Sequence, residues 1–185
     1  MRATLRTGTV VAVAVAVGLP AMGAADSRSV TQEPSRDAVL EAARAIMIAA
    51  ENCALVTLGV DGRPQARMMN PFAPEEDLSV WMATNPGTRK VAEIRADERV
   101  TLIYFDPADP GYVTLLGDVR LIDDADERRA RWKDEWNLYY PGGPLDDDYL
   151  LMEFVPTRVE VVSVKFGIAD DPQAWKPAIV EMGGS

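Results

Sequence analysis

The sequence predicts a mostly β protein, a small antiparallel β-barrel with two or three flanking helices in a single domain. Runs rich in β-branched and aromatic residues alternate with clusters of turn residues, and seven such runs can be counted as strands. Asp61-Gly62 is a strong hairpin turn and Pro74–Asp77 is a second turn, so neighbouring strands are expected to be antiparallel. The chain has 185 residues, 48% of them hydrophobic, which is enough for one well-buried core.

The N-terminal segment, residues 1–25, is typical of a secretory signal peptide. Arg2 and Arg6 form its basic start, Thr9–Leu19 is its apolar stretch, and small residues lead to a cleavage site at its end. Residues 26–34 would then be a polar linker. The alternative, an uncleaved membrane anchor, is disfavoured because the apolar stretch is shorter than the roughly 20 residues that span a bilayer. We therefore expect an exported protein, periplasmic or secreted, with no stable membrane span after cleavage.

Composition excludes several classes of site. The chain contains no histidine, which argues against His-based catalytic triads, the usual zinc sites and a His-ligated haem, so no metal site is expected. Its formal net charge of -10 disfavours nucleic acid and anionic membrane surfaces as partners. Cys53 is the single cysteine and cannot form an internal disulfide. A buried, inert thiol is favoured there over a reactive one.

The domain is expected to span residues 35–166 and to begin with a helix. Ser35 is a good N-cap, and the apolar stripe that follows it has a helical period, so this helix should end near Glu51 and pack across one end of the sheet. Three strands come next, and Asn85-Pro86 then opens a short second helix. These strands are Cys53–Val60, which is apolar on both faces, Gln65–Pro71 and Leu78–Thr84.

The second half is expected to contain four more strands and a third helix. Asp123–Leu138 has helical character, with acids first and basic residues later, and an irregular loop, Tyr139–Asp148, follows it. Pro156 is expected to divide the last two strands, and Gly117 to mark a bulge or a bend. The strands are Arg99–Phe105, Tyr112–Ile122, Tyr149–Val155 and Arg158–Phe166. Residues 167–185 show no period and are expected to be a loosely held tail.

The stretch Arg67–Lys90 concentrates positive charge on an otherwise acidic chain. A strand with an outward Arg67 is followed by a second strand and then by the Thr-Arg-Lys cluster of residues 88–90 at the start of a helix. Free N–H groups and the positive dipole end of a helix add to such side-chain charges, so this arrangement suits a phosphate. Each cation taken alone is also typical of an ordinary solvent-exposed face of a strand or helix.

Three motifs at this spacing, after the Asp-Gly hairpin, resemble the FMN-binding split β-barrel family. They are Arg67-Met68-Met69, Trp81–Asn85 and Gly87–Val91. This family is the pyridoxamine 5'-phosphate oxidase-like superfamily, and the resemblance is closest to its general stress protein branch, over residues 36–165. It implies a split-barrel fold, FMN as the cofactor, and a homodimer with the flavin at the subunit interface.

The resemblance also implies which residues hold FMN. In the family, the second strand, the end of the third strand and the Ser/Thr-Arg-Lys cluster hold the phosphate and the ribityl chain, and the partner's long strand contacts the flavin. By position, the cofactor-binding residues here are Arg67, Met68, Met69, Ala83, Thr84, Thr88, Arg89 and Lys90, with Tyr112 and Thr114 near the place that matches the partner's strand.

The leading hypothesis is a flavin-dependent oxidoreductase that acts on a small molecule. No side chain is proposed as catalytic, because the cofactor carries the chemistry in such enzymes. Pyridoxamine 5'-phosphate oxidase activity itself is not expected, because that enzyme has a C-terminal substrate-binding segment rich in Arg and Trp, and here no Arg follows Arg158. Asn70 also replaces the aliphatic residue that usually follows the Arg-Met-Met run.

Two alternatives stay open. One is a non-enzymatic carrier or sensor of the cell envelope that holds a flavin, a deazaflavin or a tetrapyrrole, and the other is an envelope protein without any cofactor. A choice also remains for four aromatic residues, which form either a lid over a ligand or, in the favoured interpretation, the packing of a helix onto the barrel. They are Trp132, Trp136, Tyr139 and Tyr140.

Overall fold

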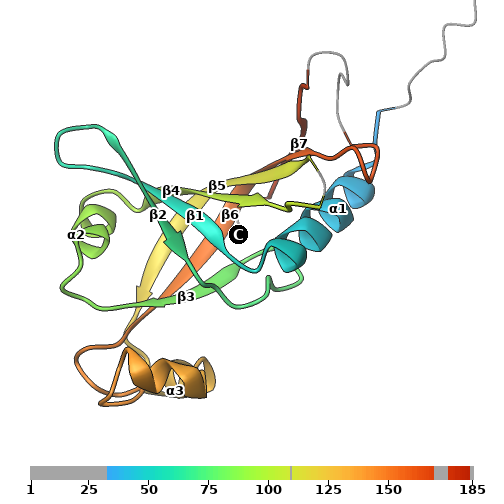
Figure 1. The fold of residues 1–185 in the computed structure, drawn as a ribbon. Helices are drawn as coiled ribbons and strands as arrows, with labels where there is room; N and C mark the ends of the chain where they lie inside the picture. The colour runs from blue at the N-terminus through green and yellow to red at the C-terminus, as the bar shows by residue number, and fades with distance from the viewer. Residues whose placement is uncertain (1–32, 109, 169–174, 184–185) are drawn as a thin grey trace, which may run out of the picture. The chain divides into compact units, whose positions relative to one another are not determined.

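The computed structural model describes residues 33–108, 110–168 and 175–183. The expected signal peptide and almost all of the expected linker lie outside the described residues. Strands and helices follow one another in the described part as Figure 1 shows. The strands are β1 (Cys53–Leu58), β2 (Pro64–Met69), β3 (Val80–Thr84), β4 (Arg99–Phe105), β5 (Tyr112–Ile122), β6 (Leu150–Val162) and β7 (Ala178–Glu181). The helices are α1 (Arg36–Ala50), α2 (Arg89–Ala96), α3 (Ala125–Ala130) and the short 3-10 helix η1 (Asp134–Leu138).

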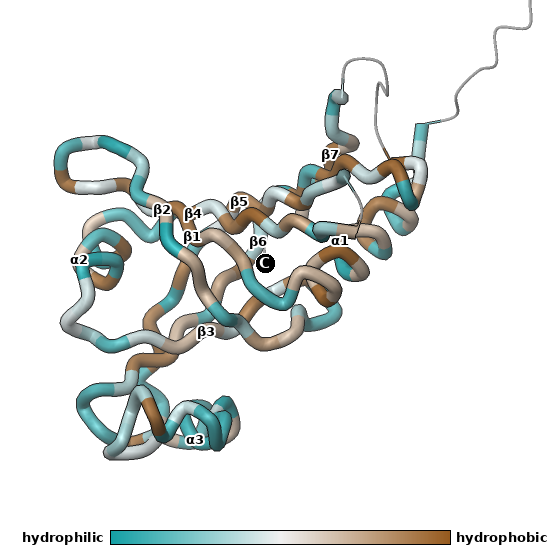
Figure 2. The backbone as a smooth tube through the Cα atoms, viewed as in Figure 1, coloured by the Kyte–Doolittle hydropathy of each residue, from teal (hydrophilic) through white to brown (hydrophobic). Residues whose placement is uncertain are grey.

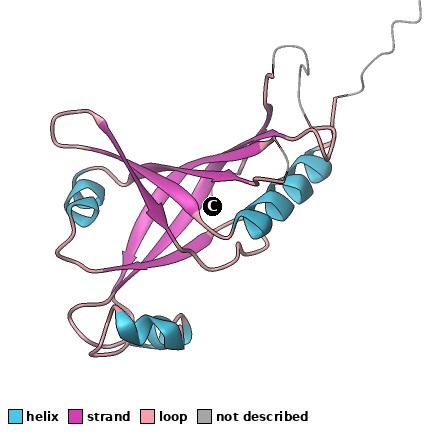
Figure 3. Ribbon diagram, in the orientation of Figure 1, coloured by secondary structure: helices cyan, strands magenta, loops and turns pink. Residues whose placement is uncertain are grey.

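All the strands belong to one antiparallel sheet, with the order β2-β1-β4-β5-β6-β3 and with β7 paired to the second half of β6. The sheet is strongly twisted, as Figure 3 shows. Within the described residues β2 pairs with β1 and β3 pairs with β6, but β2 and β3 do not pair with each other. The prediction of a mostly β, antiparallel split barrel is therefore confirmed, and its split lies between β2 and β3.

The last strands differ from the prediction because Pro156 does not divide them. β6 runs without a break from Leu150 to Val162, and Pro156 lies opposite Gly117 at a register shift in its pairing with β5. A proline lacks the N–H that a regular ladder needs, but a bulge tolerates it. A side chain at Gly117 would meet the Val155 carbonyl oxygen, because a Cβ there lies only 2.1 Å from it. The bulge expected at Gly117 is thus what allows one long strand.

The expected helix over Asp123–Leu138 is also replaced by two shorter elements. Asp124 caps α3 by accepting hydrogen bonds from the amides of Asp126 and Glu127, and the helix ends at Ala130, with Arg131 as its C-cap residue. Arg131 then binds Glu75, and Lys133 donates to the Pro71 carbonyl at 3.1 Å. These contacts with the loop before β3 hold the chain in a turn between α3 and η1. No residue of α3 is buried, and Figure 2 shows that the helix is mostly hydrophilic.

The C-terminal tail expected over residues 167–185 contains a strand. β7 pairs with β6 from Arg158 to Val161, and its residues alternate between buried and exposed. The Arg36 guanidinium donates to the Glu181 carbonyl at 2.7 Å, which ties the start of α1 to this strand. The sequence pattern is too short to reveal β7, because four residues hold little periodicity.

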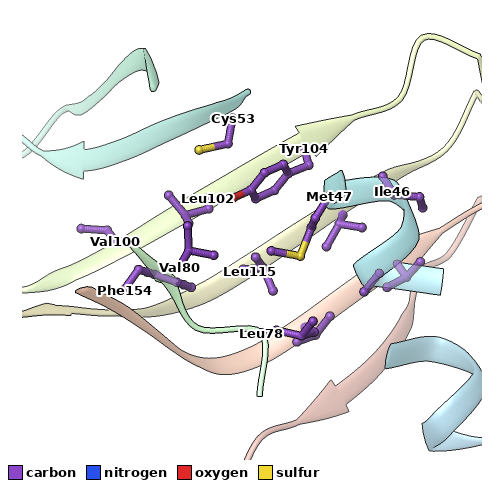
Figure 4. Close-up of a cluster of buried hydrophobic side chains, with 14 of the residues drawn as sticks. Ile46, Met47, Cys53, Leu78, Val80, Val100, Leu102, Tyr104, Leu115 and Phe154 are labelled. Carbon is purple, nitrogen blue, oxygen red and sulfur yellow. The ribbon is translucent and has the colours of Figure 1, made fainter. Parts of the chain in front are cut away.

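The main core packs α1 against side chains of the sheet, as the close-up in Figure 4 shows. The Ser35 side chain caps α1 by accepting from the Ala38 amide, and the helix buries Val39, Ile46 and Met47. Cys53 is fully buried in this core, as expected of an inert thiol. Among the described residues no helix is both long and apolar enough to span a membrane.

Candidate cofactor site

A cavity of about 490 Å³ lies at the split of the barrel, between the edges of β2 and β3. β2 has a neighbouring strand on one side only, so alternate backbone N–H and C=O groups of β2 point away from the ladder. On the outer edge of β3 the Phe72 amide donates to the Trp81 carbonyl at 2.8 Å, so the loop after β2 covers part of that edge. The residues that line the cavity come from β2, β3, α2 and the segment around η1. They are Met68, Met69, Asn70, Ala83, Thr84, Lys90, Glu135, Trp136, Tyr139 and Tyr140.

Five of the predicted site residues line this cavity, and β2 and β3 place four of them. Met69 is buried and Met68 is 68% exposed, so the two methionines lie on opposite faces of β2, as strand alternation requires. Ala83 and Thr84 lie opposite Leu151 and Leu150 on β6 at the end of β3. The strands thus bring two segments that are separated in the sequence to one opening.

Lys90 forms the polar end of the cavity. Its Nζ donates to the Thr84 hydroxyl at 2.8 Å and to the Thr88 hydroxyl at 3.3 Å, and the two hydroxyl oxygens are 3.3 Å apart. Burial lowers the pKa of Lys90, and the nearby positive charge of Arg67 lowers it further. Thr88 is the N-cap residue of α2, so the free N–H groups of the first helical turn lie beside these three side chains.

Arg67 does not point outward, and that prediction is wrong. It lies on the same face of β2 as the buried Met69, and only 17% of its side chain is exposed. One guanidinium nitrogen donates to the Thr57 hydroxyl at 2.5 Å and to the Gln65 carbonyl at 2.8 Å. The other donates to Glu93 at 2.6 Å. These partners pull the side chain towards the interior between β1, β2 and α2.

Glu93 is the functional candidate that the sequence reasoning missed. Its side chain is 3% exposed and accepts hydrogen bonds from Thr57 at 2.6 Å and from Arg67, and its other oxygen is 3.0 Å from Arg89 Nε. Burial opposes ionisation of Glu93, but the hydrogen bonds from Thr57 and Arg67 and the charges of both arginines outweigh it and lower the pKa. The one available signal was its spacing four residues after Arg89 on a helix.

The charges of this cluster favour an anion. Arg67, Arg89 and Lys90 are cations, and among the described residues Glu93 is the one carboxylate paired with them, so the four side chains together carry two net positive charges. A phosphate monoester carries between one and two negative charges near neutral pH. We call these four residues, with Thr84 and Thr88, the cradle. Of the cradle, Lys90 and Thr84 line the cavity, whereas Arg67, Thr88, Arg89 and Glu93 do not. Arg89 is 68% exposed.

The aromatic residues combine the two expected roles. Trp132 and Trp136 pack edge to face, each within 6.0 Å of the Tyr149 ring, so they fasten the segment after α3 onto β3 and β6. Trp136, Tyr139 and Tyr140 also line the cavity, and Tyr139 is 69% exposed. Packing holds the inner rings, while the outer ones form a wall of the cavity.

Tyr112 does not join this site within one chain. It begins β5 and pairs with Val162, whereas the other end of β5, at Ile122, pairs with Leu151 beside Ala83. An 11-residue strand separates these two ends. Tyr112 therefore lies away from the cavity of its own chain.

A sequence profile described as pyridoxamine 5'-phosphate oxidase matches residues 39–163, which is most of the chain. The chain belongs to the pyridoxamine 5'-phosphate oxidase family. Members of this family typically bind FMN. A search of curated proteins found no match.

Several solved structures share this fold. A general stress protein 26-related protein of Clostridium acetobutylicum is 20% identical, with a TM-score of 0.66, and the match covers 77% of this chain and 94% of that one. A protein of Nostoc punctiforme described as pyridoxamine 5'-phosphate oxidase-related and FMN binding is 17% identical, with a TM-score of 0.58 and coverage of 83% and 99%. A heme binding protein of Mycobacterium smegmatis is 21% identical, with a TM-score of 0.55 and coverage of 70% and 55%.

The residues of this family member fit FMN. The cradle offers hydroxyl donors, a partly buried ammonium and two net positive charges to the phosphate. The aromatic and methionine side chains around the cavity offer an apolar surface to the ring system, and the edges of β2 and β3 offer backbone groups to its polar edge. A volume of about 490 Å³ is within the usual range for a cofactor pocket. No group of metal-ligating side chains occurs among the described residues.

Proposed function

We propose that this protein binds FMN at the split of its barrel and is a flavin-dependent oxidoreductase for a small molecule. The observation that carries the proposal is the position of Lys90, whose ammonium is held by Thr84 and Thr88 at one end of a cavity walled by aromatic side chains. A fixed cation next to an apolar wall matches a ligand with a phosphate at one end and a flat ring system at the other.

The proposed roles divide between side chains and backbone. Lys90, Thr84 and Thr88 contact the phosphate directly, and Arg67 from β2 and Arg89 from α2 add charge and hydrogen bonds. Residues Met68, Met69 and Ala83 contribute backbone groups at the strand edges that line the cavity.

The chain's own residues bind and orient the ligand and exclude water. Bound FMN supplies hydride and electron transfer, which no side chain of this protein provides. Trp136 is 6% exposed, and its fixed ring shields one side of the cavity from solvent. No acid or base among the lining residues is proposed as catalytic.

A homodimer is proposed as the working form. The outer face of β4 and β5 exposes Phe105 (59%) and Ile103 (38%), and these lie opposite Tyr112 and Thr114 in the strand register. An apolar sheet face of this kind suits burial against a second copy. Such a dimer would bring the partner's Tyr112 towards the flavin, in a position that the same chain cannot reach.

The alternative is a carrier or sensor that holds a ligand without turnover. The heme binding protein of Mycobacterium smegmatis, which shares the fold, supports a tetrapyrrole as one candidate ligand. The chain has no histidine, so a haem in this protein would need another axial ligand. A flavin or deazaflavin carrier would use the same cradle.

Two measurements decide between these proposals. An absorbance spectrum of the protein as isolated shows flavin bands if FMN is bound, and added FMN should raise the melting temperature. A colourless protein whose melting temperature does not respond to FMN contradicts the flavin proposal. Oxidation of the reduced flavin by dyes, quinones or oxygen faster than free flavin indicates an enzyme, and a rate equal to that of free flavin indicates a carrier.

Export of the protein is a separate proposal that rests on the N-terminal sequence. Fractionation of cells that express the full chain should place it outside the cytoplasm. Mass spectrometry of that material should find Asp26 as the first residue. Retention of the full-length chain in the cytoplasm would contradict this proposal.

A further inference from the structure

The carboxylate of Glu93 lies next to the arginines of the proposed phosphate site, although electrostatics alone disfavours a negative charge there. Glu93 is 3% exposed, and three groups from three different elements meet it: the Thr57 hydroxyl from β1, the Arg67 guanidinium from β2 and Arg89 Nε from its own helix α2. A negative charge close to a bound phosphate repels it, and burial of a carboxylate is itself costly. Such a residue needs a compensating role.

The geometry shows what Glu93 does to Arg67. The two nitrogens at the end of the guanidinium are divided between two sets of partners: one donates to Thr57 and to the Gln65 carbonyl, and the other donates to Glu93. These bonds leave the side chain one orientation, between the strands and α2. A long, flexible arginine held in this way loses little further freedom when a ligand binds.

Glu93 also gathers like charges that otherwise repel one another. Arg67 and Arg89 each lie within 3.0 Å of a different oxygen of the same carboxylate. Lys90 is the third cation of the cluster, and the charge of Glu93 opposes the lowering of its pKa by burial and by Arg67. The carboxylate therefore keeps three cations together and charged on one side of the cavity.

We propose that Glu93 is a positioning residue of the cradle, which fixes Arg67 and Arg89 around the phosphate and so makes the site selective for FMN over riboflavin. This inference rests on the proposed function. Glu93 itself touches no part of the ligand, and its effect passes through the two arginines.

The sign of one measurement separates positioning from simple charge. Glu93→Gln keeps the size of the side chain but removes the negative charge and one acceptor. If only net charge mattered, this change would make the cradle more positive and tighten FMN binding. If Glu93 positions the arginines, FMN binding weakens by about 10- to 100-fold, as expected for the loss of charge-assisted hydrogen bonds, while riboflavin affinity stays unchanged.

A second variant tests the same idea without a change of charge. Thr57→Val keeps the side-chain shape but removes the hydroxyl that joins Glu93 to Arg67 at 2.6 Å and 2.5 Å. It should also weaken FMN binding and leave riboflavin binding alone. Glu98→Gln, which removes an exposed carboxylate just after α2, is the matched control and should bind FMN like the wild type.

The experiment is a fluorescence titration of the purified full chain and its variants with FMN and with riboflavin, next to a melting curve of each protein. Weaker FMN binding with unchanged riboflavin binding in both variants supports the inference. Tighter or unchanged FMN binding in Glu93→Gln overturns it, and so does an equal loss of both affinities, which indicates a merely structural role. If the wild type does not bind FMN, the proposed function and this inference both fail, and the wild-type titration by itself shows that outcome. If the wild type binds FMN, the variants test this inference separately.

Discussion

The ammonium of Lys90 lies 2.8 Å from the hydroxyl of Thr84, so the first turn of α2 and the end of β3 meet in one hydrogen bond at the split of the barrel. Thr84 is only 4% exposed, and it lies opposite Leu150 in the central strand β6. The position of the ammonium is therefore set by the sheet and by the helix together. This is the reason that the cation is a fixed part of the site and not a mobile surface charge.

Replacement of Lys90 by alanine should weaken FMN binding by about 10- to 100-fold, because a hydrogen bond between charged groups contributes about 1.5–3 kcal/mol. Riboflavin, which has no phosphate, should lose little affinity. Fluorescence titration with both ligands measures the difference. Arg63→Ala is the control, since it removes an 82% exposed cation from the hairpin between β1 and β2. Equal FMN affinities for Lys90→Ala and the wild type would remove Lys90 from the site.

The aromatic wall allows stability and binding to be separated. Tyr139 is 69% exposed and lines the cavity, whereas Trp136 is 6% exposed and packs against several rings. Tyr139→Ala should change the free energy of unfolding by less than about 0.5 kcal/mol. It should weaken the binding of FMN and of riboflavin several-fold. Trp136→Ala should lower the free energy of unfolding by about 3–5 kcal/mol. Denaturant melts and flavin titrations of both variants test this contrast, and a stable Trp136→Ala protein would contradict it.

The bulge between β5 and β6 should tolerate no side chain at Gly117. A Cβ there lies 2.1 Å from the Val155 oxygen and 2.8 Å from the Phe154 ring, so the two strands must move apart. We expect Gly117→Ala to cost about 1–3 kcal/mol, as other overpacked sites do. Gly183→Ala is the control, because a Cβ at that position meets nothing within 4 Å. Equal denaturation midpoints for the two variants would show that the bulge can relax.

Acid should destabilise the protein partly through Glu93. Its folded pKa is lowered, so it binds fewer protons in the folded state than in the unfolded state. Its contribution to stability is therefore complete above the unfolded pKa of about 4.3 and is lost as the pH falls through the folded value. Denaturant unfolding of the wild type and of Glu93→Gln from about pH 7 to pH 3 should show a smaller loss of stability in the variant. If the free energy of unfolding falls equally with pH in the wild type and in Glu93→Gln, Glu93 does not contribute to the acid sensitivity.

The Cys53 thiol should be silent in the folded protein. Burial raises its pKa to about 11, and the residue is fully buried. A thiol reagent such as DTNB should react with it only after unfolding by denaturant, at a rate that follows the unfolding transition. Fast reaction in native buffer would show that the strand end at Cys53 opens locally.

Several elements could be predicted because their signals are local. Arg99–Phe105 and Tyr112–Ile122 form strands with the predicted bounds, since each is a long β-prone run between loop or turn residues. The first helix follows from its cap at Ser35 and from its apolar stripe. Met68, Met69, Ala83, Thr84 and Lys90, which the resemblance to the family singled out, line one cavity.

Other features depend on contacts that the sequence does not show. Local propensity favours a break at Pro156, but the bulge at Gly117 accommodates the proline. Local propensity also favours a helix to Leu138, but Arg131 and Lys133 bind the loop before β3 and turn the chain. In both places the free energy of tertiary contacts exceeds the small preferences of single residues.

The sequence by itself determined the class of fold, the position of most strands along the chain and the stretch that forms the candidate site. It could do so because periodicity, turns and capping act between near neighbours. Only the tertiary structure decided the direction of Arg67 and the role of Glu93. The partners of Arg67 come from β1 and α2, and its bond to Glu93 joins residues 26 positions apart. A charge near the surface of a strand and a charge buried against a distant carboxylate have the same sequence pattern, and packing alone distinguishes them.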